Sequence, residues 1–83
     1  MIFAAWPALA QDVPCGNRDA ILAALERTWD EVPLVRGVTS SGGLYELTVA
    51  PEGSWTVLVT LNGVTCILMT GEGMEPAMPQ PPG

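Results

Sequence analysis

The two cysteines, Cys15 and Cys66, have the most specific chemistry of any residues in this chain. They lie far apart and form no C-x-x-C motif, so they fit neither a thioredoxin-like redox pair nor a zinc knuckle. In an oxidising compartment we expect them to form a disulfide. Closing a loop of about 50 residues restrains the unfolded chain by roughly 4 kcal/mol in the entropy model. The alternative is a pair of free, buried thiols.

Residue types that support catalysis are scarce. The chain has no histidine and no lysine, so the usual general bases are missing. Ser40, Ser41 and Ser54 lie in turn-forming stretches, where we expect no base nearby. Glu46 lies on a predicted strand, where a single carboxylate is usually solvated. The sequence therefore predicts no catalytic residue and a protein that is not an enzyme.

The sequence also predicts no cofactor and no metal site. The Gly71-x-Gly73 pair opens no helix, so it is not a phosphate-binding loop. Met69, Met74 and Met78 are soft copper ligands in principle, but Met69 is expected to pack within a strand and the other two lie in a proline-rich tail. The acidic turns contain no calcium-binding D-x-D-x-D loop. The tail segments PAMP and PQPP match P-x-x-P by composition alone.

Residues 18–29, with the sequence RDAILAALERTW, predict a helix of about 13 residues. Asn17 is a favourable N-cap, and Asp19 lies in the first turn, where the helix dipole favours an acid. The apolar stripe at helical spacing consists of Ile21, Leu25 and Trp29. Pro33 ends the helix, because the residue before a proline is displaced from the α region.

After the helix the apolar period changes to two, which predicts four antiparallel strands. The first strand covers residues 33–39 and the second covers residues 44–50, with a turn between them at 40–43. A further turn at 51–54 leads into a hairpin over residues 55–70. The strands are consecutive and short, so they predict an antiparallel meander.

The Asn62-Gly63 pair is the strongest short hairpin signal in a sequence, and it sets the register of the last two strands. The expected pairs are Leu61 with Val64, Val59 with Cys66, and Val57 with Leu68. One face would carry Trp55, Val57, Val59, Leu61, Val64, Cys66 and Leu68, and the other Thr56, Leu58, Thr60, Thr65, Ile67 and Met69. We expect the first face to be the core, covered by the helix, with Cys66 turned toward the helix and Trp29 and Trp55 buried. The predicted fold is α+β, with one N-terminal helix on a four-stranded antiparallel meander sheet, stapled by one disulfide.

Residues 1–10 have the character of a secretory leader. Ile2 to Leu9 are apolar, and Ala8-Leu9-Ala10 matches the A-x-A pattern that signal peptidase cleaves. No basic residue precedes Arg18, so we expect the true leader to begin upstream. Two alternatives remain, an N-terminal strand or helix of the fold, and an uncleaved anchor that would need about 20 apolar residues.

The expected organisation has three parts. Residues 1–10 are a signal-peptide remnant, residues 11–73 form a single α+β domain, and residues 74–83 form a disordered, proline-rich tail. The chain has nine acidic residues and three arginines, for a net charge of −6. This acidic balance repels nucleic acid and anionic lipid headgroups.

The chain resembles a group of short, exported, uncharacterised proteins of Gram-negative bacteria that share a C-x-x-R … W-T … G-x-x-C pattern. The matching segments are Cys15-Gly16-Asn17-Arg18, Gly37 with Gly43-Leu44-Tyr45-Glu46, Ser54-Trp55-Thr56 and Gly63-Val64-Thr65-Cys66. The resemblance covers about Cys15 to Gly73, and the proline-rich tail departs from it. The shared motifs are structural, so the resemblance implies no activity.

These features predict a non-catalytic, periplasmic or secreted domain that acts by binding a protein or an envelope component. Nucleic acid is not an expected partner, and no stable membrane insertion is expected once residues 1–10 are removed. One alternative is a membrane-tethered accessory subunit that keeps its N-terminal apolar segment. Another is an enzyme of unrecognised type.

Overall fold

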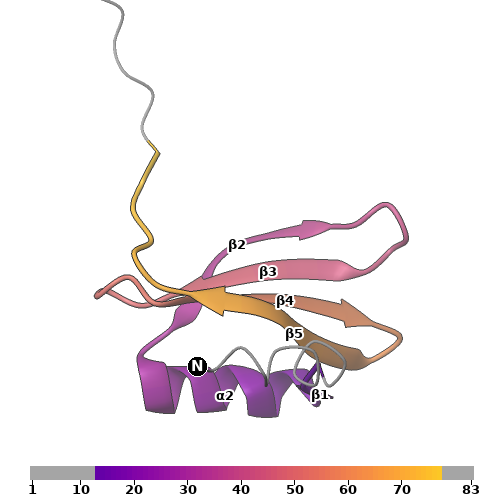
Figure 1. Ribbon diagram of the computed structural model, residues 1–83. Coiled ribbons are helices and arrows are strands. Elements are labelled where there is room, and N and C mark those ends of the chain that lie inside the picture. The colour runs from indigo at the N-terminus through magenta and orange to yellow at the C-terminus, as the bar shows by residue number, and fades with distance from the viewer. Residues whose placement is uncertain (1–12, 78–83) are drawn as a thin grey trace, which may run out of the picture.

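The computed structural model describes residues 13–77, which form one helix and a five-stranded antiparallel sheet (Figure 1). In chain order the elements are β1 (Cys15–Gly16), α2 (Arg18–Trp29), β2 (Val32–Val38), β3 (Leu44–Val49), β4 (Trp55–Leu61) and β5 (Val64–Gly71). The strands lie in the order β1-β5-β4-β3-β2, so the α+β class and the meander are confirmed. The predictions for residues 1–10, and those for residues 78–83 of the tail, lie outside the described residues.

The expected count of four strands is wrong, because the residues just before the helix form an additional edge strand. β1 pairs antiparallel with β5 through Cys15–Cys66 and Gly16–Thr65. The two cysteines form a disulfide, with their Cα atoms 4.0 Å apart and a sequence separation of 51 residues. The predicted disulfide pairing is confirmed. A strand of two residues is too short to show a period of two in the sequence.

The helix forms where the sequence predicts it. The Asn17 side chain accepts a hydrogen bond from the Ala20 N–H at 3.0 Å, which satisfies one of the unpaired donors of the first turn. Asp30 ends the helix in the left-handed conformation, with φ of 59°, and its N–H donates to the Glu26 carbonyl oxygen. Trp29, the last helical residue, is 55% exposed, so its expected burial is wrong. The helix buries Leu25, one turn earlier.

The helix covers the opposite face of the sheet from the one that the sequence predicts. The buried residues of the covered face, all at 1% exposure or less, are Glu46, Thr48, Thr56, Leu58 and Thr65. Cys66 pairs with Val59 and lies on the other face, so its expected direction toward the helix is also wrong. The Asn62-Gly63 turn decides which residues pair, but it does not decide which face the helix covers.

The hairpin register follows the turn signal up to a β-bulge. Asn62 and Gly63 both have positive φ, as a type I′ turn requires. The pairs Leu61–Val64 and Val59–Cys66 form as predicted, but Val57 pairs with Met69 instead of Leu68. Leu68 and Met69 together oppose Val57, as in a β-bulge with one extra residue. A similar register shift lies in β2, where Leu34 is the extra residue.

The end of β5 is built around a contact between a glycine and an indole. Trp55 pairs with Gly71, and a Cβ atom at Gly71 would collide with the Trp55 ring. The Trp55 Nε1–H donates to the Glu72 carbonyl oxygen at 3.3 Å. Trp55 is half-buried because its ring covers the bare glycine backbone. A little further on, the Met74 N–H donates to the Gly53 carbonyl oxygen at 2.9 Å.

Candidate functional site

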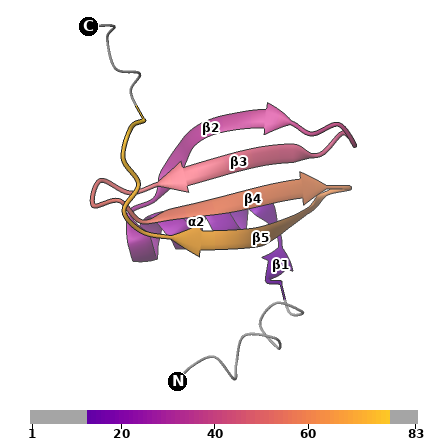
Figure 2. The ribbon, with the colours of Figure 1, turned by 45° about the horizontal axis from the view of Figure 1, so that its top comes forward.

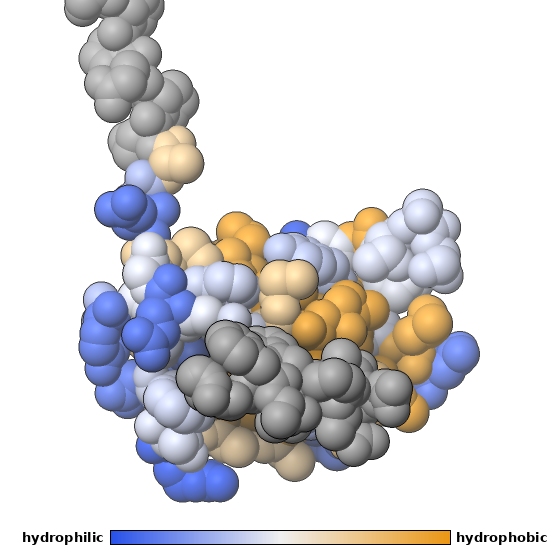
Figure 3. All heavy atoms as spheres, viewed as in Figure 1, coloured by the Kyte–Doolittle hydropathy of each residue, from blue (hydrophilic) through white to orange (hydrophobic). Residues whose placement is uncertain are grey.

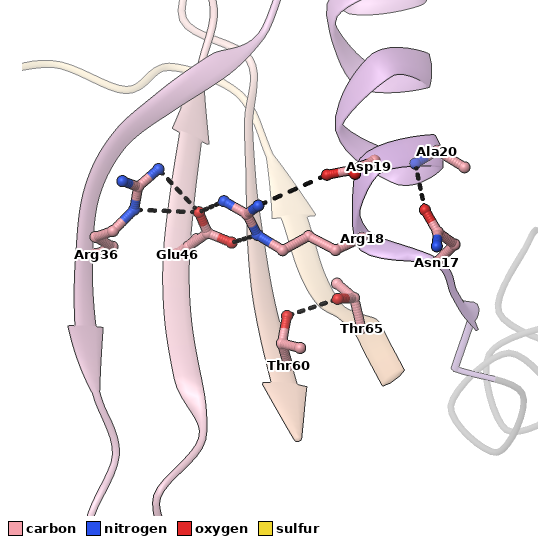
Figure 4. Close-up of polar contacts among 8 residues, drawn as sticks. All are labelled: Asn17, Arg18, Asp19, Ala20, Arg36, Glu46, Thr60 and Thr65. Atoms are coloured by element: carbon pink, nitrogen blue, oxygen red, sulfur yellow. Dashed lines mark hydrogen bonds and ion pairs between the residues drawn. The ribbon is translucent and has the colours of Figure 1, made fainter. Parts of the chain in front are cut away.

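Glu46 on β3 joins the helix to the sheet. Its side chain is completely buried, and two arginines reach it from different elements (Figure 4). Arg18, the first residue of α2, donates from Nε to Glu46 Oε1 at 2.8 Å and from Nη2 to Oε2 at 2.6 Å. Arg36, opposite Glu46 on β2, donates from Nε to Oε2 at 3.3 Å. The expectation of a solvated carboxylate is therefore wrong.

The two arginines also set the acidity of this carboxyl group. The Arg18 hydrogen bonds lower the pKa of Glu46, and the positive charges of Arg18 and Arg36 act in the same direction, against the effect of burial. The same hydrogen bond raises the pKa of Arg18. A carboxylate with a lowered pKa and both oxygens engaged is a poor general base. The cluster therefore anchors the helix to the sheet and has no arrangement suited to proton transfer.

A second buried carboxylate, Glu31, follows the helix cap and is 3% exposed. Thr48 Oγ1 donates to Glu31 Oε1 at 2.7 Å, and Ser54 Oγ donates to Oε2 at 2.8 Å. The expectation of no base near Ser54 is therefore wrong, because the left-handed cap at Asp30 turns Glu31 under the sheet. Each oxygen of Glu31 accepts one hydroxyl hydrogen bond. This pairing satisfies a buried acid without a cation.

The other polar candidates remain dispersed. Ser41 Oγ lies 3.1 Å from Thr39 Oγ1 within the β2–β3 turn, away from both buried acids. Met69 is 56% exposed, so it is not packed within the sheet as expected, and Met78 lies outside the described residues. Within residues 13–77, no three His, Cys, Asp or Glu side chains are grouped to hold a metal ion.

A shallow pocket of about 260 Å³ lies between the last turn of the helix and the ends of β4 and β5. Its lining includes Leu25, Trp29, Glu31, Trp55, Ile67 and Thr70. Glu31 is the only buried acid in this lining, and its two oxygens already accept hydrogen bonds from Thr48 and Ser54. The pocket therefore presents mainly apolar and aromatic surface.

The helix covers one face of the sheet, and we call the other face the open face. Figure 2 looks onto it, with α2 behind the sheet. Strand alternation and the bulge place on it Val32, Val35, Tyr45, Leu47, Val49, Trp55, Val57, Val59, Leu61, Val64, Cys66, Leu68 and Met69. Leu61, Leu68 and Met69 are between 45% and 56% exposed. Contiguous exposed apolar surface on a folded domain commonly marks a site of protein contact.

The open face carries no charge within the described residues. The strands contain two charged side chains, Arg36 and Glu46, and both belong to the ion-pair cluster on the helix side. Figure 3 shows apolar residues over the strands and a group of hydrophilic residues at the sheet end where the C-terminal segment leaves. An uncharged apolar face of this kind is suited to a protein contact.

The two ends of the sheet also differ in charge. Glu31 precedes β2, Glu52 lies between β3 and β4, and Glu72 follows β5. Because the strands are antiparallel, these three acids lie at the same end of the sheet. We call this the acidic end. The turns at the opposite end, residues 39–43 and 62–63, contain no charged residue. The negative charge of the sheet is therefore concentrated at one end of its strands.

Fold and site together define a small, disulfide-stapled α+β domain with one uncovered apolar sheet face. Comparison of the chain with known protein families, with curated proteins and with solved structures finds no match. Within residues 13–77, no helix has the length and apolar character needed to cross a membrane.

Proposed function

We propose that this protein is a non-catalytic domain of the periplasm or the extracellular space that acts by binding another protein surface through its open face. The observation that carries this proposal is the uncharged apolar surface of the open face, where Leu61, Val64, Leu68 and Met69 are 45–56% exposed. The free energy of the system falls when a partner removes exposed apolar side chains from water. A partner for this face is apolar and uncharged.

Two observations support a non-catalytic role. The buried carboxylates have structural partners, since Glu46 is held by Arg18 and Arg36 and Glu31 accepts hydrogen bonds from two hydroxyl groups. The chain also has no histidine and no lysine. These features favour binding over acid–base chemistry.

The Cys15–Cys66 disulfide supports the proposed location, since structural disulfides persist in oxidising compartments. The leader-like residues 1–10 and the resemblance to short exported bacterial proteins favour the same location. An acidic surface with a net charge of −6 disfavours nucleic acid and anionic lipid as partners.

Photo-crosslinking in the producing cell tests the proposal. A benzophenone amino acid at Leu68, on the open face, should give discrete protein adducts. The matched control places it at Ala23, an exposed residue of α2, and should give none. Equal adducts from both positions, or none from Leu68, would contradict binding through the open face.

A further inference from the structure

We propose that the partner of the open face is the open face of a second copy of this chain, in a two-fold dimer whose sheets stack with their strands antiparallel. This inference rests on the proposed function and names the partner for the same surface. In such a dimer each apolar residue of the open face meets another apolar residue, because the two surfaces are identical.

The position of the charges favours self-association through this face. The chain has a net charge of −6, so two copies repel one another wherever their acids approach. On the open face no acid is present among the described strand residues, because Glu46 and Arg36 point to the helix side. Stacking of the two sheets keeps both helices, with their exposed charges, on the outside.

The charge difference between the two ends of the sheet selects the antiparallel arrangement. A parallel stack would bring Glu52 and Glu72 of one copy against the same residues of the other. With the two-fold axis between the sheets and perpendicular to the strands, the acidic end of each copy lies against the uncharged turns of its partner. Stacked sheets align within about 30°, so this reversal is compatible with ordinary sheet packing.

The size of the open face fits a concentration-dependent dimer. Four strands about 4.8 Å apart, each of six to eight residues, span roughly 20 by 15–20 Å. Two such faces have a combined flat area of roughly 600–800 Å², below the standard size of specific interfaces and in the range of weak, transient contacts. The dimer should therefore form at high concentration and dissociate on dilution.

Sedimentation equilibrium over about three decades of protein concentration provides the first test. The wild-type chain should shift from monomer to dimer. Val64→Glu, at a 48% exposed position on the open face, should weaken the dimer at least tenfold. Val38→Glu makes the same change at a 79% exposed residue of β2 on the helix side, and should leave it unchanged. Equal weakening by both variants, or a wild-type chain that stays monomeric, would overturn the proposal.

A crosslinking experiment tests the orientation. The chain has no lysine, so Val64→Lys supplies the single side-chain amine, and its positive charge faces the partner's acidic end, so the dimer that Val64→Glu weakens should persist. β5 has 8 residues and its ends lie roughly 25 Å apart, so a zero-length carbodiimide bond from position 64 to Glu52 or Glu72 must join two chains. Peptide mapping should find that bond in Val64→Lys, and Val38→Lys should give no bond to either acid. Dimers without that bond would overturn the antiparallel arrangement.

Other occupants of the face give distinct results. A wild-type chain that stays monomeric but floats with phosphatidylcholine vesicles would assign the face to lipid and overturn the proposal. A chain of residues 1–83 that stays monomeric while residues 11–83 dimerise would assign the face to residues 2–9, and would also overturn it. A monomer that still gives adducts with a different protein from Leu68 would overturn the dimer but leave the proposed function standing.

Discussion

Replacing Glu46 with glutamine should destabilise the domain, because the substitution leaves two arginines without their shared anion. Removing one partner of a buried ion pair typically costs about 3–5 kcal/mol. Here the side chains of Arg18 and Arg36 are 33% and 56% exposed. Water can therefore solvate the two guanidinium groups in the variant, which makes the loss of stability smaller. We therefore expect Glu46→Gln to lower the free energy of unfolding by about 2 kcal/mol at pH 7.

The two arginines should contribute unequally. Arg18 makes two hydrogen bonds to Glu46, at 2.6 and 2.8 Å, whereas Arg36 is more exposed and its contacts are 3.2–3.3 Å long. Arg18→Met should therefore cost about 2 kcal/mol, and Arg36→Met about 0.5–1 kcal/mol, as for a partly exposed pair. Urea unfolding followed by tryptophan fluorescence measures all three variants.

The effect of Glu46→Gln should also depend on pH. The pKa of Glu46 is lowered in the folded protein, so the folded state binds this proton less readily than the unfolded chain does. The stabilisation is complete above the unfolded pKa of about 4.3 and is lost as pH falls through the lower folded pKa. The difference between wild type and Glu46→Gln should shrink across that window, since every other acid is common to both proteins. A loss below about 0.5 kcal/mol at pH 7, or one that does not change with pH, would refute the role assigned to the cluster.

Two further predictions concern the staple and the end of β5. Reducing the Cys15–Cys66 disulfide should lower the free energy of unfolding by about 4 kcal/mol, and an unchanged urea midpoint in dithiothreitol would contradict this. Gly71→Ala should lower the thermal midpoint by several degrees, because its methyl group displaces the Trp55 ring. Gly37→Ala, with no atom within 4 Å of its added Cβ, is the control, and an equal loss in both variants would contradict the Trp55 contact.

The features that the sequence predicts correctly depend on neighbouring residues. Asn17 caps the helix through a residue three positions away, and the Asn62-Gly63 turn needs positive φ at two adjacent residues. Both signals are local, so they can be recognised in the sequence without knowing the rest of the fold. The predicted helix, the consecutive strands and the first pairs of the hairpin follow from them.

The choice of the covered face depends on contacts between distant residues. Glu46 and Arg18 are 28 positions apart, and their ion pair fixes the helix against the face that carries threonines. The expectation that the more apolar face lies inside fails here, because Thr48, Thr56 and Thr65 are buried on the helix side. Once the helix covers that side, the apolar residues of the other side become the candidate binding surface.

The extra strand and the bulge gave no clear signal in the sequence. Cys15 and Gly16 form a strand because the disulfide partner lies on β5, and a pair of residues has no measurable period. The bulge at Leu68 moves Met69 opposite Val57 within an unbroken apolar run. In such a run, a shift of one residue leaves the hydrophobic pattern almost unchanged.

Nuclear magnetic resonance of leucine methyl groups with a soluble paramagnetic probe tests most directly which face of the sheet is open. In dilute protein, the methyl signals of Leu61 and Leu68 should be strongly broadened and those of Leu58, which is fully buried, should be protected. At high protein concentration, Leu61 and Leu68 should become protected as the open faces meet. Broadening of Leu58 together with protection of Leu61 and Leu68 in dilute protein would show that the helix covers the other face, and would contradict the open face assigned to the sheet.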